Sequence, residues 1–597
     1  MNDQDKICVI LFDEMALKKR LILNTTTDKI DGFQDLGNEG GRSADIADHA
    51  LVFMLQGVRK KYKQPLAHYF VKGTVSSERL SVIIKTIIQR VVQQGFSVIG
   101  TVCDQGPTNM GALNLLKRLS GISIDANYFL VDGTKIFTVY DIPHLFKSIR
   151  NNFLQGGEVL WDNKKGKWKH LIELEEKNRN TLHFMKISKR AVLPKYKSKM
   201  KVKLAAQILS NTVSAILKLQ AESVDDTAKN ELMQTAEVIE DLDQLFDCTN
   251  GPASYKDIKK NKRENVSKKS FHHNKWRTYK EKLKSLKFLK AGNYVTLKNV
   301  RCVKGYIISI SSLQDIWDFV NARGMKYLNL RQLNQDSLEN LFGLIRQHSP
   351  TNRNPTCYHF GSALKSSILT RLSSPALRGA NCEQDDNRII FDFHDVVFGT
   401  KKEKGNEQQI QEPHEQISPE DDVPVLHLAE DLEEDEDLVN FDNQPAVYVS
   451  GFVAKKILNG LTCSRCCSVF QADEQTGKGE YRSIYLREWD KNDIRLTYPS
   501  IALCNQIMVL TKVFEENIKT MLYVSGVTQY SKTIILGSID TSWLCPEHFA
   551  DCAEKLAVIF SMLLLRNECR RQNDVFSLGE ENTADVLKKA EQGGTAK

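Results

Sequence analysis

The sequence lacks the marks of a secreted or membrane-spanning protein. Thirteen cysteines among 597 residues are too few for a disulfide-rich scaffold. No basic region precedes the first apolar run, and Asp13 ends that run, which is not typical of a signal peptide. No stretch approaches the ~20 apolar residues of a membrane-spanning helix. We therefore expect an intracellular protein with reduced thiols and no membrane partner.

The sequence also lacks the phosphate-binding loop G-x-x-x-x-G-K-[ST], which argues against an ordinary GTPase. Its charge is only mildly unbalanced, with 82 Lys and Arg residues, 74 Asp and Glu residues and a formal net charge of +8. Such a balance permits a polyanionic partner without requiring one. The uneven placement of charge along the chain is therefore more informative than its sum.

The first part of the chain has the pattern of an α/β domain. Short apolar runs typical of strands alternate with two segments of helical spacing, SSERLSVIIKTIIQRVVQQG and GPTNMGALNLLKRLSG. Thr108 or Asn109 is the expected cap of the second helix. The predicted strands are residues 7–12, 20–23, 97–103 and 136–140.

Two of the predicted strands end on a carboxylate. Asp13 follows ICVILF, and Asp104 follows SVIGTVC just before the sharp turn QGPTN. Enzymes that transfer phosphoryl groups with two metal ions gather carboxylates around one point, and the carboxyl ends of strands are suited to hold them. For either aspartate alone, a solvated position at a strand end is the more common interpretation.

A third carboxylate of such a site usually comes from a helix, and NQDSLENLFGLIRQ is the candidate. Leu338, Leu341, Phe342 and Ile345 form its apolar stripe, and Glu339 lies at the edge of that stripe. From this segment alone, a surface position for Glu339 is the favoured interpretation.

Six segments carry a resemblance to a known family. In chain order they are LFDEMALKKRLILN, DGFQDLG, ALVFMLQGVRKKYKQPLAHYF, GTVCDQGPTNMGA, YDIPHLFKSIRNNF and NQDSLENLFGLIRQ. Together they resemble the P-element transposase family, which includes THAP-domain relatives. The resemblance implies an α/β RNase H-like catalytic core interrupted by a mostly α-helical insertion, with a mostly α C-terminal domain. The expected parts are residues 1–150 and 336–399 for the core, 151–335 for an insertion similar to a GTP-binding domain, 400–445 for an acidic disordered linker, 446–575 for the C-terminal domain and 576–597 for a disordered tail.

The resemblance also implies a function. The family cleaves DNA strands and joins them at a DDE site, and the resemblance assigns Asp13, Asp104 and Glu339 as the carboxylates that hold two Mg²⁺ ions. It further implies DNA as the partner, a homo-oligomer on that DNA and a nuclear location. Asp141 and His144, in YDIPHLF, are candidates for a second layer around the site or for DNA contact, and a structural role is equally compatible.

Members of the family use GTP as a cofactor for assembly on DNA, without hydrolysis. The segment DLDQLFDCTNG resembles a nucleotide motif of the family and puts forward Asp247 and Asn250, although Gly251 stands where a serine is expected. A carboxylate recognises guanine by accepting two hydrogen bonds, and Asp336 is a second candidate for this role. The candidates for phosphate contact are Lys201 and Lys203, and solvated helices are the alternative interpretation.

Two basic stretches, residues 181–203 and 256–290, are candidates for contact with DNA phosphates. Binding through Lys and Arg would weaken steeply with salt because each neutralised phosphate releases counterions. Trp276 and Tyr279, set among the basic residues, are candidates for stacking on unpaired bases. A solvated face is the alternative interpretation of both stretches.

Near the end of the chain, LTCSRCCSVF supplies Cys463 and Cys466, and WLCPEHF supplies Cys545 and His548. A C-x₂-C pair and a C-x₂-H pair offer four ligands for tetrahedral Zn²⁺. Buried reduced thiols are nearly as good an interpretation.

The family usually begins with a zinc-coordinating DNA-binding domain and a coiled coil, and this chain begins close to its first predicted strand. We therefore keep two hypotheses open. The first is a DDE-type DNA transposase. The alternative is a truncated or host-adopted regulator that binds DNA or protein and keeps the fold without catalysis. The three intact carboxylates favour the first hypothesis, and the missing binding domain favours the second.

Overall fold

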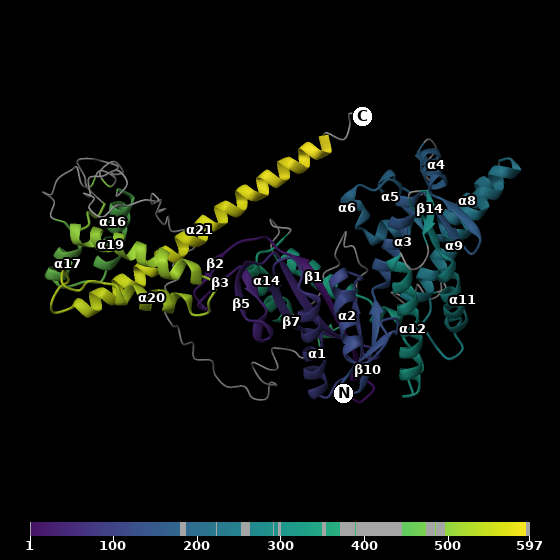
Figure 1. The fold of residues 1–597 in the computed structure, drawn as a ribbon, viewed down its shortest axis with the longest axis horizontal. Helices are drawn as coiled ribbons and strands as arrows, with labels where there is room; N and C mark the ends of the chain where they lie inside the picture. The colour runs from purple at the N-terminus through teal and green to yellow at the C-terminus, as the bar shows by residue number, and fades with distance from the viewer. Residues whose placement is uncertain are drawn as a thin grey trace, which may run out of the picture.

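The computed structural model describes most of the chain, and Figure 1 shows its three parts: a central β-sheet region, a second region on one side, and a group of helices on the other. The expected acidic linker lies outside the described residues except for its last two positions. Residues 181–186 and 256–262 of the two basic stretches also lie outside them. The described residues are 2–179, 187–222, 224–251, 263–290, 292–295, 300–348, 354–369, 388–389, 444–472, 481, 484 and 496–592.

The central sheet is built on β1 (Ile7–Ala16), which lies between an antiparallel and a parallel neighbour. Its antiparallel neighbour is β6 (His49–Gly57), which pairs with β7 (Tyr62–Val71), and its parallel neighbour is β8 (Ser97–Cys103), which pairs with β10 (Thr134–Tyr140). The strand order is β2-β3-β4-β7-β6-β1-β8-β10-β9. The remaining strands are β2 (Ile22–Asn24), β3 (Lys29–Asp31), β4 (Phe33–Asp35), β5 (Arg42–Ile46), β9 (Tyr128–Val131) and β15 (Arg388–Ile389).

The pattern of residues 49–71 did not lead us to predict the long hairpin of β6 and β7. Strand β6 is buried along nearly its whole length, so it has none of the alternation that marks a half-exposed strand. Strand β7 contains Pro65, which coincides with a shift of the strand register.

The helices of the core are α1 (Ser77–Gln93), α2 (Pro107–Leu119), α13 (Asp336–Gln347) and α14 (Cys357–Leu369). Ser76 caps α1 by accepting a hydrogen bond from the backbone of Arg79. The predicted cap of α2 was wrong by two to three residues, because Gly106 occupies that position and Pro107 begins the helix.

The inserted region is mostly helical but holds a small sheet that we did not predict. Its strand order is β12-β11-β13-β14. Residues 202–221 form two helices rather than one, because Ser210 separates them and caps the second by accepting from the backbone N–H of Val213. The elements are α3 (Ile142–Gly156), β11 (Glu158–Trp161), β12 (Lys164–Lys167), α4 (Trp168–Arg179), α5 (Lys189–Val192), α6 (Tyr196–Lys199), α7 (Val202–Ile208), α8 (Asn211–Ala221), α9 (Asp226–Asn250), α11 (His272–Ser285), β13 (Lys287–Lys290), β14 (Asn293–Val295) and α12 (Arg301–Asn321).

The suggested stacking of Trp276 and Tyr279 on DNA bases is wrong for the protein in this conformation. Both rings are buried, with 1% and 2% of their surface exposed. The indole Nε1 of Trp276 donates to the carbonyl of Cys248 at 2.9 Å. These aromatic residues form the buried face of an amphipathic helix whose other face carries the lysines.

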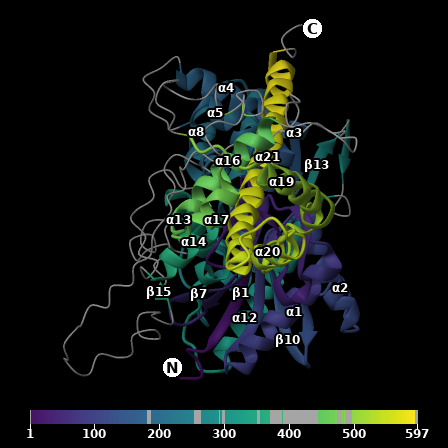
Figure 2. The same cartoon turned by 90° about the vertical axis from the view of Figure 1, so that its left-hand side faces the viewer.

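The C-terminal helices form a group of their own that contacts the sheet at its far edge. Leu21, Ile30 and Phe33 share a hydrophobic cluster with these helices. The carbonyl of Asp28 accepts from the backbone of Gly526 at 2.7 Å. Figure 2 shows the helices gathered around α21. They are α16 (Gln444–Leu458), α17 (Ser464–Phe470), α19 (Ile501–Val513), α20 (Val527–Gly537) and α21 (Phe549–Gln592).

Helix α21 continues to Gln592, whereas we expected a disordered tail from residue 576. Among the described residues, no helix combines the length and the apolar character that crossing a bilayer requires.

Candidate active site

Three aspartates meet at the carboxyl edge of the central strands. Asp13 lies near the end of β1 and pairs with Val52, Asp104 follows β8, and Asp141 follows β10. Strands β1, β8 and β10 are mutually parallel, so their carboxyl ends open to the same side of the sheet. The topology therefore brings together residues up to 128 positions apart (141 − 13).

The turn after β8 explains why a buried strand ends on Asp104. Its Oδ1 accepts hydrogen bonds from the backbone N–H of Gly106 at 2.9 Å and from Nδ2 of Asn109 at 2.6 Å. These bonds hold the carboxylate at the start of α2. The second oxygen of Asp104 is left for other contacts, since neither bond uses it.

Helix α13 is fixed to the sheet by Gln335, the residue just before it. The backbone N–H of Gln335 donates to Oδ1 of Asp141 at 2.9 Å, and its Nε2 donates to the carbonyl of Phe12 at 2.8 Å. Phe12 is the neighbour of Asp13. One buried glutamine thus joins β1, β10 and the first turn of α13, which carries Glu339. Gln335 lies just outside the helix, so the helical periodicity of the sequence could not predict this role.

His144 connects the third carboxylate to the cluster. Asp141 caps α3, because its Oδ2 accepts from the backbone N–H of His144 at 3.0 Å. The ring Nε2 of His144 lies 3.2 Å from Oε1 of Glu339, and its Nδ1 lies 3.5 Å from Oδ2 of Asp141. Asp141 and His144 are therefore part of the cluster rather than distant from it.

The charges of the cluster shift one another's ionisation. Burial raises the pKa of Asp13 to about 7, and the nearby charge of Asp104 adds to this effect. Burial alone would lower the pKa of His144, but the hydrogen bond with Glu339 and the charge of Asp141 outweigh it and raise that pKa to about 9. Burial opposes the ionisation of Glu339, and His144 overcomes it, so the pKa of Glu339 is lowered. At neutral pH, His144 is an imidazolium paired with the Glu339 carboxylate.

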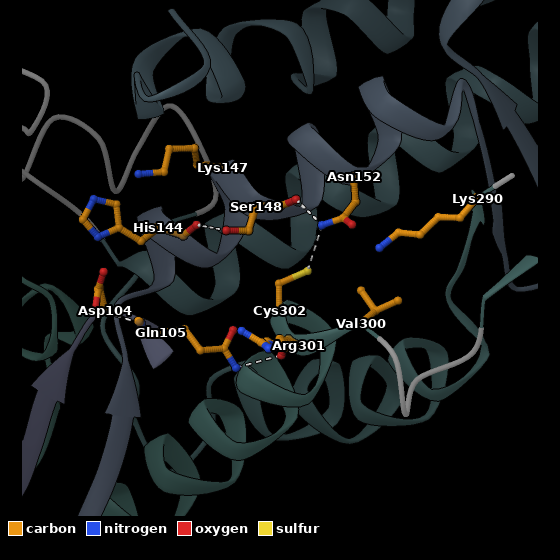
Figure 3. Close-up of a pocket in the computed structure, with 11 residues that line it drawn as sticks. Asp104, Gln105, His144, Lys147, Ser148, Asn152, Lys290, Val300, Arg301 and Cys302 are labelled. Carbon is orange, nitrogen blue, oxygen red and sulfur yellow. Dashed lines mark hydrogen bonds between the residues drawn. The ribbon is translucent and has the colours of Figure 1, made fainter. Parts of the chain in front are cut away.

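A cavity of about 390 Å³ opens beside Asp104 and is rich in basic groups. Figure 3 shows Asp104 and His144 at one end of this cavity and Lys290 toward the other. Lys147 and Arg301 also line it. Gln105 ties its wall to the insertion, since Nε2 donates to the carbonyl of Arg301 at 2.7 Å. The cations along its wall suit a polyanionic substrate such as a nucleic acid backbone, and the Asp104 carboxylate stands at one end.

The candidates for the base lie on α9 and at the start of α13, and the candidates for the phosphates lie at the start of α7. Among the base candidates, Asn250 and Asp336 meet at Asn334, whose Nδ2 donates to Oδ1 of Asn250 at 3.4 Å and to Oδ2 of Asp336 at 2.9 Å. Asp336 also pairs with Nη2 of Arg331 at 2.8 Å. Arg263 Nε pairs with Oδ1 of Asp247 at 2.6 Å. The phosphate candidates are Lys201 and Lys203.

Gly251 ends α9 with φ +71° and ψ 175°, a conformation that side chains other than glycine rarely adopt. An added Cβ would also lie 3.1 Å from Cβ of Leu330. The glycine that departs from the expected serine therefore suits the backbone of this chain.

In the described part of the first basic stretch, Lys189, Lys195, Lys199 and Lys203 are exposed and Lys201 is half-buried, which both interpretations of that stretch allow. The four residues put forward for zinc lie together where α17 and α21 begin. They are Cys463, Cys466, Cys545 and His548.

Comparisons with known proteins match this architecture. Three family models match in chain order: the TNP-like RNase H N-terminal domain over residues 1–117, the TNP-like GTP-binding insertion domain over 143–263, and the TNP-like RNase H C-terminal domain over 332–365. A solved structure, the Drosophila P element transposase strand transfer complex, aligns with TM-score 0.51 and 24% identity, and covers 63% of this chain and 79% of that chain. These matches confirm the predicted fold class, an RNase H-like core with a GTP-binding insertion.

Two curated relatives are similar along much of the chain. Transposable element P transposase of Drosophila melanogaster is 23% identical over 466 residues, which are 76% of this chain and 56% of the relative. DNA transposase THAP9 of Homo sapiens is 21% identical over 539 residues, 86% of this chain and 57% of the relative. The chain thus spans somewhat more than half the length of both relatives, and the family resemblance predicted from the sequence is confirmed.

Proposed function

Because this chain belongs to the P-element-like transposase family, we propose that it is a DNA transposase that hydrolyses DNA strands and joins a 3′-hydroxyl end to target DNA. The observation that carries the proposal is the gathering of Asp13, Asp104 and Glu339 around His144 at one edge of an RNase H-like sheet.

The donor set fits Mg²⁺. Carboxylate oxygens are the ligands that Mg²⁺ prefers. The burial and mutual repulsion that raise the pKa of Asp13 to about 7 are what a bound dication would relieve. We propose Asp13, Asp104 and Glu339 as the metal-holding residues. When bound, a pair of Mg²⁺ ions would activate the attacking oxygen and stabilise the leaving oxygen.

Other residues of the chain would position this cluster and its substrate. His144 holds the Glu339 side chain toward the aspartates, and Gln335 holds the helix that carries it. Lys147, Lys290 and Arg301 line the cavity beside Asp104, where they would contact phosphates of the DNA strand. We propose these cations as the groups that align the strand with the carboxylates.

We propose that the GTP-binding insertion takes GTP as an assembly cofactor. Asp247 and Asn250 remain the candidates for the base, with Asp336 as the alternative and Lys201 and Lys203 for the phosphates. Support comes from the match of residues 143–263 to the GTP-binding insertion family. Titration of the full chain with GTP in a calorimeter should give a binding heat that Asp247→Ala weakens and Glu339→Gln leaves unchanged. Absence of heat with the wild-type chain would contradict nucleotide binding.

The proposed partners follow from this activity: DNA as transposon ends and target, a second copy of the chain on that DNA, and a nuclear location. Similarity to transposases and to a strand transfer complex supports DNA as the partner.

A strand-transfer assay tests the proposal without depending on the earlier cleavage step. DNA ends of the element, already cleaved to leave a 3′-hydroxyl, are mixed with the full chain, Mg²⁺ and a supercoiled target plasmid. Joined products should form with the wild-type chain. Glu339→Gln should abolish them, because the side chain keeps its shape but loses the charge needed for metal.

The matched control is Asp132→Asn, which changes an exposed carboxylate on the turn between β9 and β10. It should leave product formation and DNA affinity intact. Equal product formation by the wild-type chain and Glu339→Gln would overturn the proposed mechanism. Intact DNA binding with no products from the wild-type chain would favour the non-catalytic regulator.

A further inference from the structure

Four donor atoms of the C-terminal helices converge on one point. Sγ of Cys463, Cys466 and Cys545 and a ring nitrogen of His548 all lie within 4.8 Å of one another. Nδ1 of His548 is the nitrogen that faces the sulfurs, at 3.5 Å from Cys466 and 3.7 Å from Cys545. The members of the cluster come from segments about eighty residues apart in the sequence.

These separations match a tetrahedral zinc site. With Zn–S near ~2.3 Å and Zn–N near ~2.05 Å, tetrahedral angles place sulfur and nitrogen roughly 3.6 Å apart. The two sulfur-to-nitrogen distances of the cluster, 3.5 and 3.7 Å, lie on either side of this value. Two of the six separations between the ligand atoms therefore already have the length that a tetrahedral zinc site requires.

Each ligand pair is held by the start of a helix. Cys463 is the residue before α17 and accepts from the backbone N–H of Cys467, so the C-x₂-C pair is wound into one turn. His548 precedes α21, and its backbone N–H donates to the carbonyl of Cys545 at 3.1 Å.

Cys569 on α21 shows what a simple core thiol looks like here, because it is buried in the hydrophobic cluster and is not one of the four converging residues. Cys552, also on α21, contacts Cys466 but is not among the four donors that converge. Cys463, in contrast, is only half-buried, and a histidine completes the set. Apolar packing does not require three sulfurs and a nitrogen to share one centre, whereas metal coordination does.

We propose that Cys463, Cys466, Cys545 and His548 bind one structural Zn²⁺ ion that fastens α17 to the start of α21. All four positions of the tetrahedron are filled by protein, which is the pattern of a structural rather than a catalytic site. The ring pair of Phe470 and Trp543, with centroids 5.5 Å apart, packs the same two segments together beside the metal. The site is independent of the carboxylate cluster and of the proposed transposase activity.

Metal analysis of the purified full chain tests this proposal. The wild-type chain should carry about one zinc per chain, and Cys463→Ser and His548→Ala should each lose it. Replacement by Co²⁺ should give the intense visible absorption of tetrahedral cobalt with thiolate ligands, and both variants should lose that absorption. His548→Cys should retain the metal, since four cysteines also form a tetrahedral site.

Two control variants keep the result interpretable. Cys467→Ser alters the neighbouring cysteine on α17, and Cys569→Ser alters a buried thiol on α21, and both should keep the zinc and the cobalt spectrum. A folded wild-type chain without zinc that gives no tetrahedral cobalt spectrum would overturn the proposal. Zinc that stays bound in both Cys463→Ser and His548→Ala would place the metal elsewhere and would overturn it as well.

Discussion

The chain holds two clusters of candidate metal ligands that contrast in nearly every respect. The carboxylate cluster consists of oxygen donors at the open edge of a sheet, beside a cavity lined with cations. The cysteine–histidine cluster consists of three sulfurs and one nitrogen within 4.8 Å of one another, between the starts of two helices. Both are assembled from segments distant in sequence.

We propose that the carboxylate cluster serves the reaction and that the cysteine–histidine cluster serves stability. Oxygen donors that leave positions open suit Mg²⁺ and a substrate, whereas a complete set of soft donors suits a permanent Zn²⁺ ion. The carboxylate cluster, without a metal, holds repelling charges in a partly buried place, so it costs folding free energy. The cysteine–histidine cluster, with zinc, would contribute folding free energy.

The largest expected effect comes from removing one charge of the carboxylate cluster. Asp104→Asn keeps an oxygen to accept from Gly106 and Asn109 but loses the charge. Metal-based charge stabilisation is worth several kcal/mol, so strand transfer should fall by about a thousandfold. Zinc content should stay unchanged. A loss of zinc in this variant would show that the two clusters are not independent of each other.

Next in size is the effect of opening the cysteine–histidine cluster. Cys466→Ser should weaken local stability by about 2–4 kcal/mol, because bound metal contributes directly to folding. Limited proteolysis of the full chain should then cut among the C-terminal helices at lower protease concentration than in Cys467→Ser. Unchanged resistance would contradict a structural role for the metal.

A smaller effect should follow from loosening the carboxylate cluster without touching its ligands. Gln335→Ala removes the hydrogen bond to the carbonyl of Phe12 and should slow strand transfer about 10- to 100-fold, since small displacements of a catalytic group are costly. Gln347→Ala, an exposed position on the same helix, is the control. Equal rates for the two variants would show that Gln335 does not position the cluster.

The smallest expected effect is on stability as a function of pH. The folded pKa of Asp13, about 7, lies above the ordinary value of 3.8, so the folded state binds the proton more tightly than the unfolded state. The resulting stability is present below the ordinary pKa and is lost as pH rises through about 7. In Mg²⁺-free buffer, Asp13→Asn should therefore be more stable than the wild-type chain near pH ~8, by about 1–2 kcal/mol, and this gain should shrink toward pH ~5.

Thermal unfolding at the two pH values measures this difference, with Asp132→Asn as the exposed control. A gain that is the same at both pH values would show that the ionisation of Asp13 does not cost stability. Added Mg²⁺ should reverse the advantage, because it would stabilise only the wild-type cluster.

Local patterns predicted much of the fold. Helices α1 and α13 and the strand that ends before Asp104 follow from periodicity, which depends on neighbours along the chain. The strand predicted to end before Asp13 instead continues to Ala16, because its pairing with β6 extends past that residue. The hairpin of β6 and β7 escaped prediction because a strand buried on both faces has no alternation. The suggested stacking of Trp276 on bases was wrong, since lysines around a ring indicate base stacking only if the ring is exposed, and this ring is buried.

The sequence by itself determined which residue types can donate to a metal, their spacing within each short motif and the family that the chain resembles. Only the tertiary structure decided that Gln335 joins Phe12 and Asp141, that His144 pairs with Glu339, and that Cys466 meets His548. Spacing along a strand or helix is set by backbone geometry, which a few residues specify. Contacts between residues tens or hundreds of positions apart depend instead on how whole elements pack, and that packing is decided by the burial of side chains over the entire chain.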